Sequence, residues 1–253
     1  MYTVKNLVTG YGKNVILRDL SLGIKPGLTS LIGPNGSGKS TFLKVLAGLK
    51  GYSGSVILNG HEVRNISRKK FSFSASFVMS DKNFRPSYPF SVREIISMGR
   101  LPHRGLFSGL TKNDNEIISR SSEMLGISHL LERDIMTLSD GERQLVFIAC
   151  SLAQDTGVIL LDEPTSSLDP DRSARVFELL KFLAVSGKTI IAAVHDINIS
   201  LSYSDYYIAL REGKLISHGR KINGEILRDL YGTEFIKYRN NERNDEMWRA
   251  LPR

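Results

Sequence analysis

A glycine-rich run at residues 33–41 constrains the possible folds of this chain more than any other stretch. Its sequence, GPNGSGKST, matches G-x-x-x-x-G-K-[ST], the pattern of a phosphate-binding loop. The apolar segment Leu28–Ile32 precedes the run as an expected strand, and apolar residues at helical spacing follow it. In a strand, loop and helix of this order, inward-facing backbone N–H groups and the helix N-terminus together hold a polyphosphate.

The side chains of this phosphate loop (residues 33–41) fit a nucleotide with its metal. Lys39 adds a mobile positive charge for the β- and γ-phosphates, and the Ser40 hydroxyl is placed to ligate Mg²⁺. The candidate phosphate-binding residues are Gly33, Asn35, Gly36, Ser37, Gly38, Lys39, Ser40 and Thr41. The alternative is a glycine-rich turn with an incidental lysine, but the strand and helix on either side argue against coincidence. We therefore expect nucleotide binding.

Composition indicates a globular protein that does not cross a membrane by itself. The chain has 253 residues, a length that fits one large domain or two small ones, and 41% of its residues are hydrophobic. Its longest apolar runs, such as Val158–Leu161, are far too short to span a bilayer. The N-terminus lacks the layout of a signal peptide, so we expect the chain to stay in the cytoplasm.

The net charge and the cysteine content exclude fewer classes of function than the phosphate loop does. The net charge of +8 would suit nucleic acid, an anionic membrane or the nucleotide itself, yet the basic residues are scattered. Their only dense run, Arg68–Lys70, is expected to be a solvated loop. The single cysteine, Cys150, excludes an internal disulfide and lies in an apolar run, so a buried core thiol is expected rather than a nucleophile.

The N-terminal segments read as short strands joined by turns. Val4–Val8, Val15–Leu20 and Leu22–Ile24 precede the strand of the phosphate loop and predict an antiparallel sheet. Asn59-Gly60 predicts a tight hairpin turn after another strand. Tyr11, flanked by glycines, could stack on a base, although an exposed tyrosine often has no such role.

Between about residues 86 and 153 the pattern becomes helical. Three capping boxes are expected at helix starts, and Ser128 could cap a shorter helix. The expected boxes pair Ser91 with Glu94, Thr111 with Asp114, and Ser139 with Glu142.

Two strands that end in polar residues follow this helical region. Val158–Leu161 is continuously apolar and ends in Asp162 and Glu163, as buried parallel strands do. In a phosphate-loop protein the first acid can hold Mg²⁺ through water and the second can act on an attacking water. The strand Thr189–Val194 ends in His195, at the rim where open α/β sheets bind ligands, although a structural histidine is also compatible.

A hairpin around Glu212-Gly213 and a mixed helical tail complete the chain. Together the segments predict an α/β fold: a phosphate-loop NTPase core with a mainly parallel sheet, an N-terminal antiparallel β subdomain and an inserted helical subdomain.

These motifs, in this order, resemble the ATPase subunits of ABC transporters. GPNGSGKST matches the Walker A motif, VILLDEP the Walker B motif with its following glutamate, and SSLD at residues 166–169 the D-loop. His195 matches the switch histidine, and LSDGERQ at residues 138–144 resembles the LSGGQ signature. The resemblance extends to about Gly219 and implies one domain over 1–253, with the helical subdomain at 86–153 and a C-terminal extension at 220–253.

The resemblance also implies a head-to-tail homodimer with two ATP molecules and Mg²⁺ between the subunits. The Walker A motif of one subunit would face Ser139 and Gly141 of the other. Each site residue then has an implied role: Glu163 polarises the attacking water, His195 contacts the γ-phosphate, Asp162 supports Mg²⁺, Tyr11 stacks on adenine, and Asp169 of the D-loop belongs to the nucleotide site.

Two positions depart from the family pattern. Asp140 stands where the signature has its first glycine, a mild change because Asp tolerates unusual backbone angles. Ser80 stands where the Q-loop glutamine is expected. Either Ser80 keeps a weaker, water-mediated link to Mg²⁺, or backbone or water carries the coupling role of this loop.

Residues 92–103 resemble the corresponding segment of iron-siderophore, haem and cobalamin importer ATPases. This likeness implies a polytopic permease partner, an extracytoplasmic substrate-binding protein acting indirectly, and a peripheral position on the cytoplasmic face of the membrane. Molybdate and other metal-complex importers have near-identical ATPases. The alternatives are a soluble ABC-type ATPase acting on nucleic acid or the ribosome, and a small-molecule kinase. A soluble ATPase of this type usually carries a coiled-coil insertion or a second cassette, and this sequence has neither, so no nucleic acid partner is expected. A small-molecule kinase would not require the signature.

Overall fold

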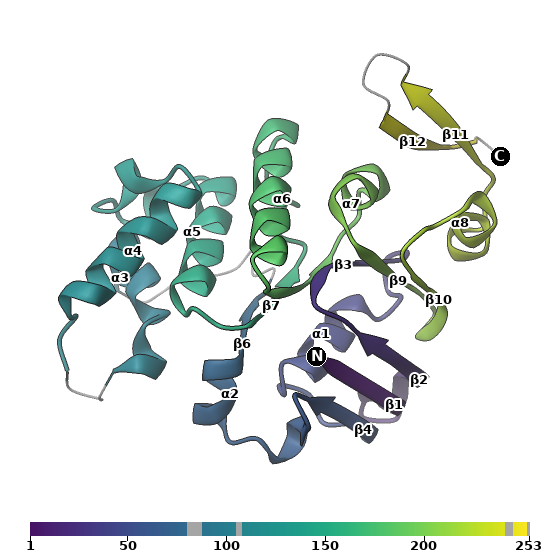
Figure 1. Ribbon diagram of the computed structural model, residues 1–253, viewed down its shortest axis with the longest axis horizontal. Helices are drawn as coiled ribbons and strands as arrows, with labels where there is room; N and C mark the ends of the chain where they lie inside the picture. Colours follow the sequence, from purple (N-terminus) through teal and green to yellow (C-terminus); the bar gives the residue numbers. More distant parts are fainter. Residues whose placement is uncertain (80–87, 105–107, 241–244, 252–253) are drawn as a thin grey trace.

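A computed structural model of the chain describes residues 1–79, 88–104, 108–240 and 245–251, and Figure 1 shows how its elements are arranged. A six-stranded sheet forms the centre. In spatial order its strands are β10 (Lys214–Gly219), β9 (Tyr206–Arg211), β3 (Gly27–Ile32), β8 (Thr189–Ala193), β7 (Val158–Asp162) and β6 (Ala75–Val78). All neighbours pair in parallel except β9 and β10. β3, β7 and β8 are buried along their whole length, as their apolar sequences require in a sheet covered on both faces.

A second, antiparallel sheet is formed by β1 (Tyr2–Tyr11), β2 (Asn14–Ile24), β4 (Ser53–Leu58) and β5 (His61–Glu62). The predicted antiparallel sheet is confirmed, but the two short strands expected between residues 15 and 24 are one strand. Asn6 and Asp19 have φ of 47° and 52°, and the Asn6 side chain donates to Asp19 Oδ1 at 2.9 Å. These irregularities let β1 and β2 shift register without ending.

Asn59-Gly60 forms the predicted turn between β4 and β5. Both residues have positive φ, 50° and 86°, which a type I′ hairpin turn requires. The run Arg68–Lys70 is exposed, as expected, but it opens the helix α2 (Arg68–Ser74) rather than lying in a loop. The Ser67 side chain caps this helix by accepting a hydrogen bond from the backbone N–H of Lys70. The prediction of a loop considered only the charges and not this N-cap residue.

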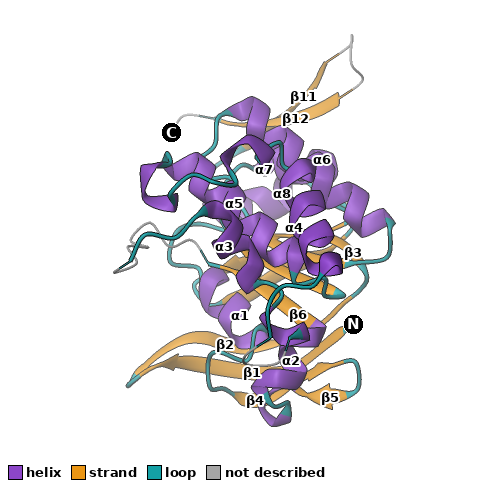
Figure 2. Cartoon of the chain, turned by 90° about the vertical axis from the view of Figure 1, so that its left-hand side faces the viewer, coloured by secondary structure: helices purple, strands orange, loops and turns teal. Residues whose placement is uncertain are grey.

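Helices cover both faces of the central sheet. α1 (Lys39–Leu46) contacts β7, β8 and β2, so it lies between the two sheets and shares a core with both. α6 (Pro170–Val185) and α7 (Ile197–Tyr203) contact β3, and α6 also contacts β8. Figure 2 shows these layers from the side.

The helices between β6 and β7 form a lobe of their own, on the left of Figure 1. It contains α3 (Val92–Met98), α4 (Lys112–Met124) and α5 (Asp140–Ala153), which contact one another. All three predicted capping boxes are confirmed. Ser128 is not a cap: it is the first residue of a 3₁₀ turn whose N-cap is Ile127, and its hydroxyl pairs with that of Ser122 instead.

The C-terminal tail differs from the expected mixed helical segment. α8 (Gly224–Tyr231) is followed by a hairpin of β11 (Phe235–Asn240) and β12 (Asp245–Ala250). The Asn198 amide fixes this hairpin to α7, since it donates to Trp248 O at 3.2 Å and accepts from Trp248 N at 2.7 Å. Across the described ranges, no helix has both the length and the hydropathy needed to span a bilayer.

Candidate nucleotide-binding site

The phosphate loop lies between the end of β3 and the start of α1. Gly36 and Gly38 have φ of 75° and 101°, and Gly38 is the N-cap of α1, so the loop turns sharply into the helix. A Cβ on Gly33 would stand 2.1 Å from Leu210 O. The backbone N–H of Gly213 also donates to Ser37 O at 3.1 Å. The β9–β10 hairpin therefore supports the loop from behind.

Lys39 is held over the phosphate loop by the loop itself. Its ammonium Nζ donates to Gly33 O at 2.7 Å and Pro34 O at 3.2 Å, and only 6% of the residue is exposed. Burial lowers the pKa of Lys39, while the nearby Glu163 and Asp162 carboxylates oppose this shift. The ammonium can exchange these carbonyls for the oxygens of a bound polyphosphate.

Ser40 and Asp162 come together although 122 positions separate them. Ser40 Oγ donates to Asp162 Oδ1 at 3.0 Å, and Asp162 is buried. Burial raises the pKa of Asp162, and the Ser40 hydrogen bond opposes the shift. A hydroxyl and a carboxylate are hard oxygen donors, and Mg²⁺ is usually bound by one or two carboxylates together with phosphate and water. The pair fits such an ion.

Glu163 and His195 also meet, because they follow the adjacent parallel strands β7 and β8. His195 Nε2 lies 2.7 Å from Glu163 Oε1. Glu163 has φ of 51°, and its backbone N–H donates to Ala193 O at 3.1 Å, so the residue is turned out of the strand and held there. Both side chains line a cavity of about 260 Å³. A carboxylate beside an imidazole there can accept a proton from water.

Ser139 and Gly141 lie at the N-terminus of α5, in the helical lobe, whereas α1 lies against the central sheet (Figure 1). Ser139 Oγ donates to Glu142 Oε2 at 2.8 Å, and Asp140 pairs with Arg143. A Cβ on Gly141 would stand 2.8 Å from Ser167 O, so the helix start packs directly on the loop at residues 166–169.

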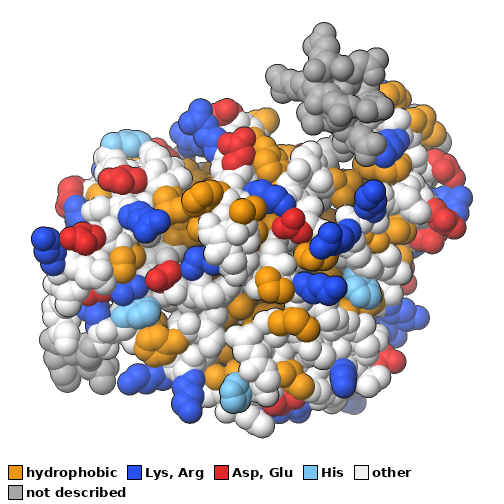
Figure 3. Space-filling model, viewed as in Figure 1, with side chains coloured by type: hydrophobic (Ala, Val, Ile, Leu, Met, Phe, Trp, Pro, Cys, Tyr) orange, Lys and Arg blue, Asp and Glu red, His pale blue; other side chains and the backbone are white. Residues whose placement is uncertain are grey.

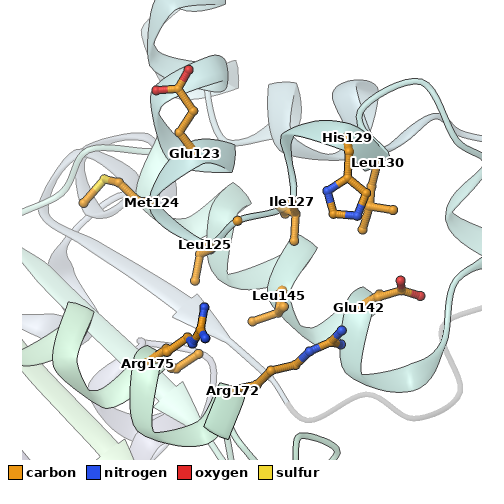
Figure 4. A pocket seen from close by; sticks show the side chains of 12 residues that line it. Glu123, Met124, Leu125, Ile127, His129, Leu130, Glu142, Leu145, Arg172 and Arg175 are labelled. Atoms are coloured by element: carbon orange, nitrogen blue, oxygen red, sulfur yellow. The ribbon is translucent and has the colours of Figure 1, made fainter.

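Beside this helix start, α5, α6 and the end of α4 with the segment after it line a cavity of about 400 Å³ (Figure 4). Arg172 extends across it toward Glu142 in the view of Figure 4. Hydrogen bonds from Ser139 lower the pKa of Glu142, and the charges of Arg133 and Arg172 add to the shift. The capping carboxylate therefore stays ionised. Asp169, the N-cap of α6, accepts from the backbone N–H of Arg172 at 2.8 Å.

Tyr11 is 49% exposed at the end of β1. Lys50 Nζ lies 3.5 Å from the centre of its ring, a contact that the sequence did not predict. Thr9 Oγ1 donates to Gly51 O at 2.5 Å and holds the two segments together. The sequence carries no signal for this pairing, since the two segments are far apart in the chain.

Two further sequence predictions concern the segment that follows β6 and the thiol of α5. Ser80 lies outside the described residues. Cys150 is partly exposed rather than fully buried and lines a cavity of about 220 Å³ with Phe77, Met79 and Phe147. Burial of its sulfur raises the pKa of the Cys150 thiol to about 11, so it is a protonated, unreactive thiol at neutral pH.

The sequence profile of a family described as ABC transporter matches residues 17–166 of this chain. The ferric enterobactin transport ATP-binding protein FepC of Escherichia coli (strain K12) is 36% identical over 234 residues, covering 90% of this chain and 86% of that protein. The iron(3+)-hydroxamate import ATP-binding protein FhuC of Bacillus subtilis (strain 168) is 39% identical over 225 residues, covering 86% and 81%.

Solved structures agree with this relationship. An inward-facing conformation of a putative metal-chelate type ABC transporter superposes with a TM-score of 0.84 at 26% identity, covering 99% of this chain and 97% of that one. A dimeric bacterial ABC transporter cassette superposes with a TM-score of 0.79 at 27% identity, covering 88% and 100%. The chain therefore belongs to the ABC transporter family and carries the ATP-binding domain of that family.

Proposed function

We propose that this protein is the ATP-hydrolysing subunit that drives a membrane permease importing a metal chelate of the iron-siderophore, haem or cobalamin type. The observation that carries the proposal is the position of Glu163 and His195, 2.7 Å apart at the ends of neighbouring strands. Two relatives support the substrate class, since their names specify ferric enterobactin and iron(3+)-hydroxamate.

In this proposal the chain's own residues bind and orient the nucleotide. Backbone N–H groups of the phosphate loop and Lys39 hold the phosphates, and Ser40 and Asp162 hold Mg²⁺, which supplies charge neutralisation on the phosphate oxygens. Glu163 accepts the proton of a water aligned with the γ-phosphate, and His195 orients Glu163 and contacts the phosphate. Positioning and electrostatics account for most of the rate of phosphoryl transfer.

We further propose that two copies close head to tail over two ATP molecules. Ser139 and Gly141 begin a fourteen-residue helix, α5, whose N-terminal N–H groups can bind a γ-phosphate held by the second copy. The α3, α4 and α5 lobe, inserted as a subdomain at about 86–153, would receive the permease on the cytoplasmic face of the membrane. Closure of the two copies would then move the permease halves.

The test is affinity capture of the tagged full-length protein from gently solubilised membranes of its own host. Recovery of a polytopic permease at a stoichiometric level supports the transporter proposal. Chelate uptake is then measured in cells in which Lys39→Ala replaces the native chain. Loss of uptake of an iron chelate, haem or cobalamin supports the substrate class, whereas loss of molybdate uptake alone contradicts it.

The second candidate is a soluble ABC-type ATPase that acts on nucleic acid or the ribosome. The net charge of +8 is its only support. On the face shown in Figure 3, basic and acidic side chains are interspersed rather than separated into one basic patch. Capture of ribosomes or nucleic acid without any membrane protein would favour this candidate and overturn the transporter proposal.

A further inference from the structure

A second cavity lies away from the phosphate loop, where the N-terminal sheet meets the edge of the central sheet. It has a volume of about 310 Å³. The end of β2, the start of β3 and the open end of the β9–β10 hairpin line it, and Lys25, Tyr206 and Arg220 are among the lining residues. No residue of the nucleotide site is among them.

The rim of the cavity is cationic. Lys25 and Arg220 line it, and no acidic residue does. Within the described part of the chain, no carboxylate forms a salt bridge with Lys25 or Arg220. The negative charge of Asp205 acts on Arg220, but its carboxylate already accepts hydrogen bonds from Lys181 Nζ at 2.5 Å and from the backbone N–H of Leu28 at 2.9 Å.

Arg220 is held in place by an aromatic wall. Its guanidinium carbon lies 5.2 Å from the centre of the Tyr206 ring, and Nη2 donates to the Tyr206 hydroxyl at 3.1 Å. On the same wall, the Tyr207 hydroxyl pairs with Ser217 Oγ at 2.9 Å and is therefore already satisfied. A guanidinium that is held in position binds a planar carboxylate or a phosphate better than a freely rotating one.

We propose that this cavity is a binding site for a small organic anion, a phosphate monoester or carboxylate on a compact apolar body. The acid group accepts hydrogen bonds from Arg220 and Lys25, and the body packs on Ile24, Tyr206 and Ile208. A volume of about 310 Å³ is at the lower end for ligand cavities and suits a compact ligand.

The test is isothermal titration calorimetry of the full-length chain with phenyl phosphate as probe. Saturating ADP and Mg²⁺ fill the phosphate loop beforehand, so that the probe reports only on other sites. We expect saturable binding at one site per chain, and weaker binding of inorganic phosphate because it lacks an apolar body. Absence of saturable binding at millimolar concentration of the probe would overturn the proposal.

Variants locate the binding. We expect Arg220→Gln and Lys25→Gln each to weaken phenyl phosphate binding about tenfold or more. Lys214→Gln is the matched control, since it removes an exposed positive charge from β10 without touching the cavity, and should change affinity less than about twofold. Equal affinities in Arg220→Gln, Lys25→Gln and Lys214→Gln would contradict the assignment.

Discussion

At the scale of single residues, Glu163 is the group on which hydrolysis should depend most. In Glu163→Gln the side chain keeps its size and its place beside His195 but cannot accept a proton. We expect ATP affinity to stay within a few-fold and the rate of phosphate release to fall by about 10²–10⁴. The measurement is steady-state phosphate release together with equilibrium binding of ATP.

The control for this change is Glu116→Gln, which makes the same substitution at an exposed position of α4. It should leave phosphate release unchanged. Unchanged hydrolysis in Glu163→Gln as well would remove Glu163 from the role of general base.

Tyr11 allows a second residue-scale prediction, because base stacking and phosphate binding can be measured separately. Its ring has Lys50 against one side, so a base would occupy the other. We expect Tyr11→Ala to weaken ATP binding by about 1–3 kcal/mol, whereas Tyr11→Phe keeps it. Binding of inorganic tripolyphosphate, which has no base, should be the same in all three proteins. A parallel loss of tripolyphosphate affinity would show that Tyr11 acts on the fold of the loop instead.

At the scale of elements, a buried ion pair joins helices of the helical lobe. Arg100 Nε donates to Asp114 Oδ1 at 2.8 Å, and Arg100 Nη1 donates to Ala153 O at 2.8 Å, so this guanidinium joins α4 to the end of α5. Both charged side chains are almost fully buried. Breaking such a pair on one side leaves an uncompensated buried charge and costs about 3–5 kcal/mol.

We therefore expect Arg100→Met to lower the thermal midpoint by roughly 10 °C, measured by circular dichroism or calorimetry. Arg93→Met is the matched control: Arg93 pairs with Glu132 at 2.8 Å, but both side chains are exposed, so its loss should cost less than about 1 kcal/mol. Equal shifts in the two variants would contradict a special role for the buried pair.

The same pair gives a pH dependence of stability. Hydrogen bonds from Arg100, and then from Thr111, lower the pKa of Asp114 to about 2 from an ordinary value of 3.8. The folded state therefore gains stability that is fully present above about pH 4 and is lost as pH falls toward about 2. Urea unfolding across this window should show a steeper loss of stability in the native protein than in Arg100→Met. Identical slopes would mean that Asp114 does not titrate with the pair.

Much of this fold could be predicted from local sequence, and the exceptions have physical causes. Capping boxes and the Asn59-Gly60 turn satisfy backbone groups within a few residues, so their signals lie in the sequence itself. The contact between Ser40 and Asp162 could be predicted from the Walker A and Walker B motifs, because the ends of parallel strands meet at one rim of the sheet. Arg100 with Asp114, and Tyr11 with Lys50, are tertiary contacts, and charge or exposure at one position does not reveal its partner.

The tail shows the same limit at the level of an element. β11 and β12 are an isolated two-stranded hairpin, which is marginal in water without further packing. The Asn198 amide, 50 positions away from Trp248, is one of the contacts that hold it, and the Tyr231 ring against Phe235 is another. Local propensity could not decide between helix and strand there, because a contact with α7 stabilises the result.

At the scale of the whole molecule, the proposed nucleotide site draws its residues from two parts of the chain. The phosphate loop lies against the central sheet, and Ser139 and Gly141 lie in the helical lobe. A prediction follows for assembly: with ATP bound and hydrolysis blocked by Glu163→Gln, the chain should form a dimer that size-exclusion chromatography with light scattering detects. Adding Ser139→Ala should weaken this dimer, because the helix start loses a hydroxyl that would face the γ-phosphate of the second copy.

The control has to separate this contact from helix capping, since Ser139 also caps α5. Ser91 caps α3 with the same geometry, through a capping box with Glu94. Ser91→Ala in the Glu163→Gln background should therefore cost a similar amount of stability, about 1 kcal/mol, without changing the ATP concentration needed for dimer formation. If both variants shift that concentration equally, the effect is one of capping, and the head-to-tail arrangement loses this support. If only Ser139→Ala shifts it, the second subunit completes each nucleotide site through the start of α5.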